Sequence, residues 1–489
     1  MSEDNQLIAQ RKEKLLALKK AGINPYPSTF NKKDYSLDLL QQYKNLKKEE
    51  KTNKKAIIAG RIMTLRIMGK AGFAHVQDAK GQIQIYAREN DLGKDAYHIF
   101  SKLDLGDIIG ITGTVFRTKK GELSIWTEDL KLLAKSLHPL PEKWHGLKDK
   151  EIRYRQRYVD LMVNPQVKET FLKRSQIISA MREFLLKEGF IQVETPILQS
   201  IYGGTNARPF KSFLHNLKID VYMRISNELY LKRLIVGGYE KIFEFSPDFR
   251  NEGIDSTHNP EFLQMETMWA YANYQDNMNF CEKLIKYIVK KAFNKYKLTY
   301  NKTTLDFGKP FSKLSMLDAL KKYAKISADK LNTQELLNLL KQHKLEHDSD
   351  ISWGNAIALL FKELVEDKLI QPTIIYDYPK ETSPLAKIKT QDPRFVERFE
   401  LYINGWEIAN SYSELNDPEL LKQNWESQEK LAKKGDEEAQ RMDKDFIRAL
   451  EIGMPPTSGL GIGVDRLVMA LTNSQSIKDV IFFPFMKPE

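Results

Sequence analysis

The stretch Phe243-Glu-Phe-Ser-Pro-Asp-Phe-Arg-Asn-Glu-Gly-Ile-Asp-Ser-Thr-His-Asn-Pro-Glu-Phe-Leu-Gln-Met-Glu-Thr-Met-Trp-Ala270 decides the fold. It indicates a strand, a polar loop and a returning strand, because glycine, asparagine and proline separate two apolar runs. On a strand, Arg250 and Glu252 share one face. One face of the returning strand carries Phe262, Gln264, Glu266 and Met268. This set suits a ligand with phosphate, a purine and an ammonium group, although an isolated surface hairpin with one ion pair also fits.

A second hairpin is expected within Phe399–Leu415, because Asn404-Gly405 separates two alternating apolar runs. The two-residue turn pairs Ile403 with Trp406, and Tyr402 with Glu407. Glu400 then shares a face with Glu407, one diagonal step away. Two adjacent carboxylates repel each other unless a cation lies between them, and their oxygens suit magnesium. A salt-bridged surface pair is the alternative interpretation.

The returning strand of this hairpin has a problem of parity. In a regular strand, Asn410, Tyr412 and Glu414 point to the face opposite Glu407. All four side chains reach one pocket only if a bulge or turn interrupts the strand near Ala409. We therefore predict such an irregularity.

A third informative stretch is Gly459-Leu-Gly-Ile-Gly-Val-Asp-Arg466, which precedes an apolar helix over Leu467–Thr472. Its glycines allow a ligand to approach the backbone closely. Arg466 lies near the helix start, where a guanidinium and the helix terminus favour phosphate. The alternative is a structural arginine at a strand–helix corner.

Residues 56–135 favour a small barrel. Five short alternating or β-branched runs are separated by turns, with a helical stretch, Asp95–Lys102, after the third run. This order is typical of the five-stranded oligonucleotide-binding barrel, the OB-fold. Its positive charge and aromatic residues suit single-stranded nucleic acid, whose bases stack on rings.

The composition narrows the class of protein. The 489 residues carry a formal net charge of +11, which favours an acidic partner such as nucleic acid. Cys281 is the only cysteine, so an intrachain disulfide or a cysteine-rich metal site is excluded. The opening residues resemble no secretory signal, and no apolar run is long enough to cross a bilayer. These features predict a cytoplasmic protein without a membrane segment.

Taken together, these stretches carry a family resemblance. Phe249–Phe262 resembles the second signature of class II aminoacyl-tRNA synthetases, and Gly459–Arg466 resembles the third. A long helix over Asn164–Glu188, Gly189 and a strand to Pro196 resemble the first signature, which builds a dimer interface in that family. Over nearly its whole length the chain is similar to the bacterial-type lysyl-tRNA synthetases of class II.

The resemblance implies an α+β multidomain fold, with an OB-fold barrel followed by an antiparallel sheet flanked by helices. The expected limits are 1–55 for a basic helix and connector, 56–140 for the anticodon-binding barrel, 141–163 for a linker, and 164–489 for the catalytic domain. A helical insertion is expected at about 276–395. The resemblance also implies a homodimer.

The activity implied is that of an ATP-dependent lysine–tRNA ligase. Such an enzyme joins L-lysine to ATP, giving lysyl-adenylate and pyrophosphate, and then transfers lysine to the 3′ end of tRNA(Lys). The resemblance implies Mg²⁺, about three ions per subunit.

Matching positions carry the family's site roles onto this chain. Arg250 and Arg466 would be catalytic. ATP would be bound by Arg250, Glu252, His258, Asn259, Phe262 and Arg466. Lysine would be bound by Gly204, Glu228, Arg250, Glu266, Met268, Asn410, Tyr412 and Glu414. Glu400 and Glu407 would hold metal, and the anticodon would be read by Arg66, Phe73, Gln84 and Glu122.

Met268 departs from the family pattern, which usually has tyrosine there. The tyrosine hydroxyl would bond the ε-ammonium of lysine, whereas methionine sulfur is a weak acceptor. Looser lysine binding is therefore expected.

Three other readings remain open. Synthetases for aspartate or asparagine share the barrel and signatures, but their anionic or neutral substrates do not need the acids Glu266 and Glu414. Paralogues that lysylate a protein lack the barrel. A non-catalytic RNA-binding relative would not need Arg250, Glu400, Glu407 and Arg466.

Overall fold

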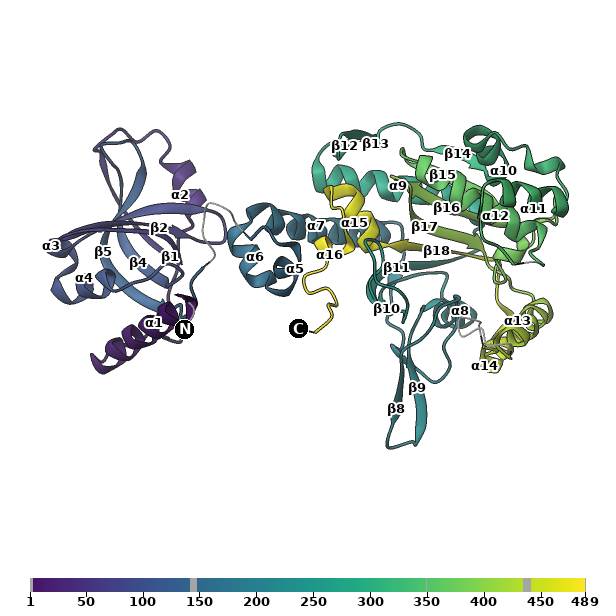
Figure 1. The fold of residues 1–489 in the computed structure, drawn as a ribbon, viewed down its shortest axis with the longest axis horizontal. Helices are drawn as coiled ribbons and strands as arrows, with labels where there is room; N and C mark the ends of the chain where they lie inside the picture. Colours follow the sequence, from purple (N-terminus) through teal and green to yellow (C-terminus); the bar gives the residue numbers. More distant parts are fainter. Residues whose placement is uncertain (1–2, 141–146, 349, 434–440, 489) are drawn as a thin grey trace. The chain divides into compact units, whose positions relative to one another are not determined.

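The structure is a computed structural model that describes residues 3–140, 147–348, 350–433 and 441–488. The chain divides into two compact units, residues 1–146 and 147–489, which are considered separately (Figure 1). The expected start of the linker, at residues 141–146, lies outside the described residues.

The first unit contains a closed five-stranded barrel in the order β1-β2-β3-β5-β4. The strands are β1 (Lys51–Met68), β2 (Ala71–Gln77), β3 (Gln82–Arg88), β4 (Ile108–Arg117) and β5 (Leu123–Ala134). Two short helices, α3 (Glu89–Leu92) and α4 (Lys94–Ser101), follow β3, so the predicted OB-fold is confirmed. Helices α1 (Glu3–Lys20) and α2 (Ser36–Gln42) precede it. The predicted connector is shorter than expected, because β1 already begins at Lys51.

The second unit is built on an eight-stranded sheet in the order β14-β15-β16-β17-β18-β11-β10-β6. The six central strands are antiparallel, and the outer pairs β14–β15 and β6–β10 are parallel. The strands are β6 (Ile191–Gln192), β10 (Lys241–Phe249), β11 (Glu261–Ala270), β14 (Ser312–Ser315), β15 (Thr373–Pro379), β16 (Phe395–Ile403), β17 (Trp406–Ser413) and β18 (Thr457–Gly463). The predicted antiparallel sheet flanked by helices is thereby confirmed.

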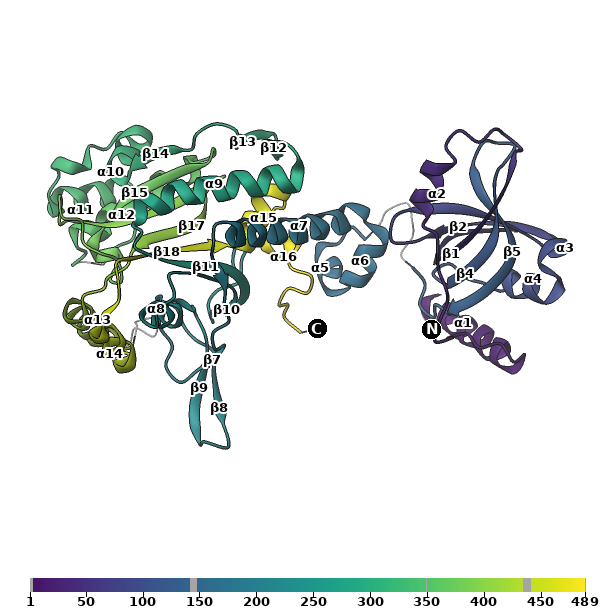
Figure 2. The same cartoon turned by 180° about the vertical axis from the view of Figure 1, so that it is seen from behind.

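Three helices cover one face of this sheet: α7 (Pro165–Lys187), α9 (Tyr274–Phe293) and α15 (Val464–Thr472). Figure 2 shows α9 lying across the sheet, with α7 beside it and extending toward α6. The main apolar cluster lies here, and includes Met265 of β11 and Leu401 of β16. Because side chains alternate along a strand, Glu266 and Glu400 point to the other face.

The insertion expected at about 276–395 is only partly helical. Its helices include α10 (Met316–Ala319), α11 (Thr333–Gln342) and α12 (Trp353–Leu364). It also contributes β12 (Lys297–Tyr300), β13 (Thr303–Asp306), β14 and β15, and the last two extend the main sheet. The insertion therefore belongs to the framework of the sheet.

The remaining elements surround this framework. They are α5 (Lys150–Arg155), α6 (Arg157–Val163), β7 (Leu198–Gln199), β8 (Lys211–Leu214), β9 (Ile219–Met223), α8 (Glu228–Val236), α13 (Pro418–Lys433), α14 (Lys444–Gly453) and α16 (Ile477–Val480). Strands β7, β9 and β8 form a separate small sheet. Among the described residues, no helix is long and apolar enough to span a membrane.

The hairpin between β16 and β17 has the predicted register. Asn404 and Gly405 both have positive φ, 58° and 75°, as a type I′ turn requires. Ile403 pairs with Trp406, and Tyr402 with Glu407. The next partner of β16, Leu401, pairs with Ala409, so Ile408 is an extra residue. The predicted bulge is confirmed, one residue before Ala409.

Candidate active site

A cavity of about 370 Å³ lies on the sheet face that α7, α9 and α15 leave uncovered. Strands β11, β16, β17 and β18, helix α8 and the loop after β10 supply its walls. Fourteen of the residues expected to bind ATP, lysine or metal line this one cavity: Gly204, Glu228, Arg250, Glu252, His258, Asn259, Phe262, Glu266, Glu400, Glu407, Asn410, Tyr412, Glu414 and Arg466.

Arg250 and Arg466 face the same space from different elements. Arg250 follows the end of β10, so it and Glu252 belong to the loop and not to a strand, contrary to the expectation. The loop begins early because β10 and β11 last pair at Phe249 and Glu261. The guanidinium carbon of Arg250 lies 5.0 Å from the ring centre of Phe262. A cation beside an aromatic face suits a nucleotide.

Arg466, in the first turn of α15, joins two other parts of the cavity wall. Its Nη2 lies 3.0 Å from His258 Nε2, and its Nη1 donates to the backbone oxygen of Glu407 at 3.2 Å. Arg466 therefore lies between the loop after β10 and the hairpin β16–β17. A guanidinium in this position can bind phosphate oxygens through several donors.

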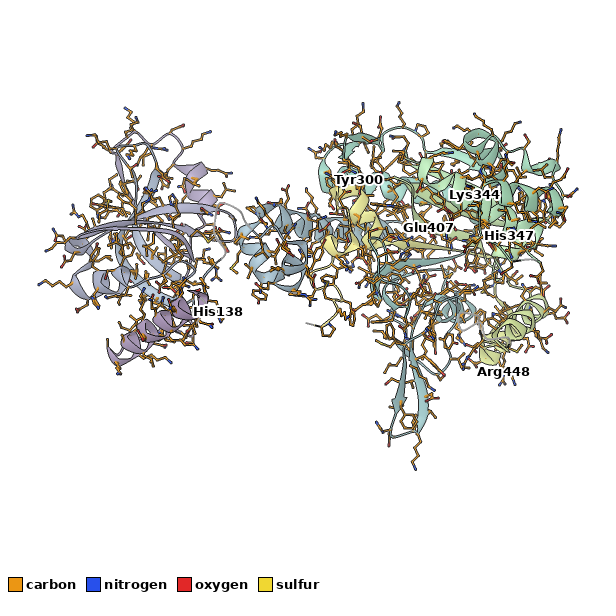
Figure 3. The ribbon with its side chains drawn as sticks, viewed as in Figure 1. His138, Tyr300, Lys344, His347, Glu407 and Arg448 are labelled. Atoms are coloured by element: carbon orange, nitrogen blue, oxygen red, sulfur yellow. The ribbon has the colours of Figure 1, made fainter. Side chains whose placement is uncertain are left out.

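Glu400 and Glu407 form an acidic end of the cavity, and Figure 3 shows Glu407 among the strands of the main sheet. Buried Glu400 accepts hydrogen bonds from Tyr378 and Tyr402, at 2.8 and 2.5 Å, and pairs with Arg398. Burial, and then the charge of Glu407, raise the pKa of Glu400 above its ordinary value. A divalent cation would relieve both effects.

The donors of this acidic end fit magnesium. Oxygen ligands are the kind that Mg²⁺ prefers, and it commonly takes only one or two carboxylates together with water and phosphate. Within the described ranges, no three or more His, Cys, Asp or Glu side chains group as a metal site. Glu400 and Glu407 could therefore offer two carboxylates to Mg²⁺, with its other positions left to phosphate and water.

Three buried glutamates, Glu228, Glu266 and Glu414, form the other end of the cavity. Glu228 Oε2 accepts a hydrogen bond from the Tyr412 hydroxyl at 2.6 Å. Glu266 Oε2 is buried and has no hydrogen-bond partner among the described residues. Such an atom costs free energy unless a ligand satisfies it.

The pKa values of these acids reflect their surroundings. Burial, followed by the charges of Glu228, Asp248 and Glu414, raises the pKa of Glu266 well above its ordinary value. Burial likewise raises the pKa of Glu414 to about 8. A positively charged ligand would favour the ionised form of each. This end of the cavity therefore suits ammonium groups.

Sequence reasoning missed Lys232, whose ammonium pairs with both Glu228 and Glu414. The available signal was its position on the helix, four residues after Glu228, where the two side chains are neighbours. The same reasoning missed Arg398, the partner of Glu400, which lies two residues earlier on β16. Residues two positions apart on a strand share a face, so the contact between Arg398 and Glu400 could also have been predicted.

Met268 does not line the cavity, which differs from the expectation. It is 1% exposed and packs in an apolar cluster with Leu229 and Ile242. A side chain at Gly459 would collide with the Glu414 carboxylate and with the end of Met268. Met268 therefore lies close to Glu414 but beneath the cavity floor.

The barrel brings its four predicted residues to one area. Arg66 of β1 is paired with Phe73 of β2, whose ring centre lies 4.6 Å from that of Tyr86. Gln84 Nε2 donates to Glu122 Oε2 at 2.7 Å. The arrangement combines a guanidinium, stacked rings and hydrogen-bonding groups, which suits unpaired bases.

Comparisons with known proteins cover both units. Residues 149–487 match the family described as tRNA synthetases class II (D, K and N), and residues 56–133 match the OB-fold nucleic acid binding domain. A lysine–tRNA ligase of Pelotomaculum thermopropionicum is 52% identical over 487 residues, which is 99% of this chain and 95% of that protein. A lysine–tRNA ligase of Thermoanaerobacter pseudethanolicus is 51% identical over 489 residues, which is 100% of this chain and 97% of that protein.

Proposed function

Because the chain belongs to the class II tRNA synthetases of the aspartate, lysine and asparagine group, we propose that it is a lysine–tRNA ligase. It joins L-lysine to ATP, releases pyrophosphate, and transfers the lysyl group to tRNA(Lys). The observation that carries this choice is the buried acidic end of the cavity, formed by Glu228, Glu266 and Glu414. Acids select a cationic amino acid over aspartate or asparagine.

The first step needs no general base, because the lysine carboxylate is already ionised at neutral pH. It attacks the α-phosphorus of ATP, a new carbon–oxygen–phosphorus link forms, and pyrophosphate leaves. Arg250 binds the attacking carboxylate and the α-phosphate together, and so orients them for in-line attack. Arg466 and His258 bind the outer phosphates. Phe262 stacks on adenine, and Glu252 and Asn259 contact the nucleotide.

Glu400 and Glu407 would hold magnesium, about three ions per subunit, in the presence of ATP. The bound cation supplies neutralisation of phosphate charge. At the other end, Gly204, Glu228 and Glu266 receive the α-amino group, and Glu414 receives the ε-ammonium. Asn410 and Tyr412 shape the space between them.

We assign anticodon recognition to the barrel, with expected limits of 56–140. Phe73 stacks on a base, while Gln84 and Glu122 bond base edges and Arg66 binds phosphate or a base. In the second step, the terminal ribose hydroxyl of tRNA attacks the adenylate carbonyl, and AMP leaves. The catalytic domain is assigned to 164–489, after a linker over 141–163.

We also propose that the enzyme is a homodimer in the cytoplasm. The segment resembling the first signature carries exposed apolar residues, among them Leu172, Leu186 and Ile191. Exposed apolar side chains gathered on one segment favour association with a second copy. Charged tRNA is consumed where protein is made, which supports the cytoplasm.

Pyrophosphate exchange across a panel of the twenty amino acids tests the proposed function. The expected result is rapid exchange that depends on lysine and on Mg²⁺, with little exchange for aspartate or asparagine. Exchange with aspartate or asparagine instead would identify a sister enzyme. No exchange with any amino acid, together with retained tRNA binding, would favour a non-catalytic RNA-binding protein.

Phe73→Ala should weaken binding of tRNA(Lys) by the barrel. Losing one base-stacking ring costs about 1–3 kcal/mol, so the KM for tRNA(Lys) is expected to rise about tenfold or more. Lysine-dependent pyrophosphate exchange should not change, because that reaction needs no tRNA. The matched control is Tyr26→Ala, which removes an exposed ring outside the strands. An unchanged KM for tRNA in Phe73→Ala would contradict this role.

Met268→Tyr should tighten lysine binding. A hydroxyl near Glu414 that reaches the ε-ammonium would contribute about 1–2 kcal/mol, so the KM for lysine should fall about tenfold. Met268→Leu keeps an apolar side chain of similar volume and should leave KM unchanged. Lysine saturation curves in pyrophosphate exchange measure both. An equal or higher KM in the tyrosine variant would show that a side chain at position 268 does not reach the ε-ammonium from beneath the cavity floor.

A further inference from the structure

Lys232 of α8 is a charged side chain in a wholly buried place. It is 1% exposed, and it is not among the residues that line the cavity. Its Nζ lies 2.5 Å from Glu228 Oε1 and also pairs with Glu414 Oε2. A buried ammonium is costly unless it is paired, so this position requires both acids. Lys232 therefore lies just behind the wall and bridges two of its three carboxylates.

The other charges around this end of the cavity have partners of their own. Asp248 lies 3.4 Å from Arg224 and also faces the charge of Arg250, while Arg224 pairs with Glu244 at 2.7 Å, so two guanidinium groups offset these two carboxylates. On the far side, Arg398 pairs with Glu400. The charges left at the amino-acid end are three carboxylates, Glu228, Glu266 and Glu414, and one ammonium, Lys232. When all four are ionised, their sum is minus two.

Lysine presents two ammonium groups to this end, while its carboxylate is assigned to Arg250. Two positive charges then meet a net charge of minus two. Without Lys232 the same end would carry minus three, and one carboxylate would keep a proton or remain unpaired. The buried ion bridge thus matches the charge of the pocket to a diammonium substrate.

We propose that Lys232 is a specificity-determining positioning residue, which sets the charge of the amino-acid pocket to minus two and fixes the positions of the Glu228 and Glu414 carboxylates that it bridges. This inference rests on the proposed function. Lys232 does not touch the substrate, and it acts through the two carboxylates that it bridges.

The proposal predicts a particular change in pH dependence. Lys232 faces Glu228 on its own helix, Tyr412 on β17 and Glu414 just after β17. Glu266 of β11 lies beside these groups. The positive charge of Lys232 lowers the pKa of Glu414, although burial keeps that pKa at about 8. Removing Lys232 therefore raises the pKa of Glu414 further, and protons compete with lysine over a wider range.

Lys232→Met is expected to raise the KM for lysine about 30-fold at pH 7.5, with kcat for pyrophosphate exchange changed less than about threefold. The gap should narrow toward pH 8.8, because higher pH ionises Glu414 again. A purely structural role would displace the KM profile by the same factor at every pH. Such a parallel displacement, or an unchanged KM, would overturn the proposal. The KM for ATP is measured in the same variant, because it reports on the phosphate end of the cavity.

Arg233→Met is the matched control, because Arg233 is the next residue of α8 and pairs with Asp443 and Asp445. It should leave the pH profile of the lysine KM unchanged. A second comparison does not depend on the folding of Lys232→Met. Glu228→Gln alone leaves the pocket at minus one, whereas Glu228→Gln with Lys232→Met restores minus two.

The double variant should therefore bind lysine more tightly than Glu228→Gln alone, by about fivefold at pH 8, although it carries one more substitution. It removes Glu228 and Lys232 together, so only Glu414 loses its ammonium partner, which bound lysine then replaces. Weaker binding by the double variant would overturn the charge-matching idea. If the unmodified enzyme showed no lysine-dependent exchange, the proposed function itself would fail, and that outcome is separate from either comparison.

Discussion

Arg250→Ala should reduce lysine-dependent pyrophosphate exchange by about 10³-fold or more. Arg250 is assigned to the point where the lysine carboxylate and the α-phosphate meet, and it lines the same cavity as Arg466. Removing it leaves two anions facing each other without the donors that hold them in line. The loss of one well-placed donor to developing charge costs about 10²–10³ in rate, and Arg250 is assigned contacts to both reactants.

A second variant at position 250 should separate the effect of the guanidinium geometry from that of its positive charge. Arg250→Lys keeps a cation but not the planar fork, so we expect an intermediate loss of exchange. Arg182→Ala is the control, because Arg182 contacts Phe245 and Gln192 outside the cavity. Binding of tRNA(Lys), assigned to the barrel, should be retained in all three variants. Near-normal exchange in Arg250→Ala would refute its assigned role.

Glu414→Gln should raise the KM for lysine about 100-fold and remove its pH dependence. Burial raises the pKa of Glu414 to about 8. Its ionised form is assigned to the ε-ammonium of lysine. In the unmodified enzyme, the KM for lysine should therefore rise as the pH falls from about 8.5 to about 6.5, because Glu414 takes up a proton. Glutamine cannot titrate and offers no charge, so its profile should be high and flat. Losing a charged partner in a buried pair costs about 2–5 kcal/mol.

Pyrophosphate exchange at saturating ATP and varied lysine measures this profile. Glu363→Gln, in α12, provides a control at an exposed position away from the cavity. It should reproduce the pH profile of the unmodified enzyme. A pH-dependent KM in Glu414→Gln would assign the titration to another group, with Glu266 as the first candidate because burial also raises its pKa.

Local patterns in the sequence were sufficient for much of this site. The turn at Asn404-Gly405 set the register of β16 and β17, because a two-residue hairpin fixes which residues pair. The need for Glu407 and Glu414 to reach one cavity then required a bulge, which lies at Ile408. These inferences succeeded because each depends on residues close together in the chain.

Contacts between distant segments were harder to predict. Lys232 on a short helix looks like a solvent-facing lysine, and only its contact with Glu414, far along the chain, shows that it is buried. Met268 followed the alternation of its strand but lies under the floor, because Gly459 on β18 leaves room for its end beside Glu414. The insertion looked helical because β14 has only four residues and joins the sheet through β15.

The extra residue at Ile408 gives β17 two consecutive parts with opposite phase. The part before it carries Glu407, which is assigned to metal, and the metal is needed whichever amino acid is activated. The part after it carries Asn410 and Tyr412 and leads to Glu414, and these residues are assigned to selecting the amino acid. Redesign of substrate choice can therefore be confined to the second part, with ATP handling preserved. Deleting Ile408 would leave Glu407 and Asn410 two residues apart, so a regular strand would still carry both side chains on one face.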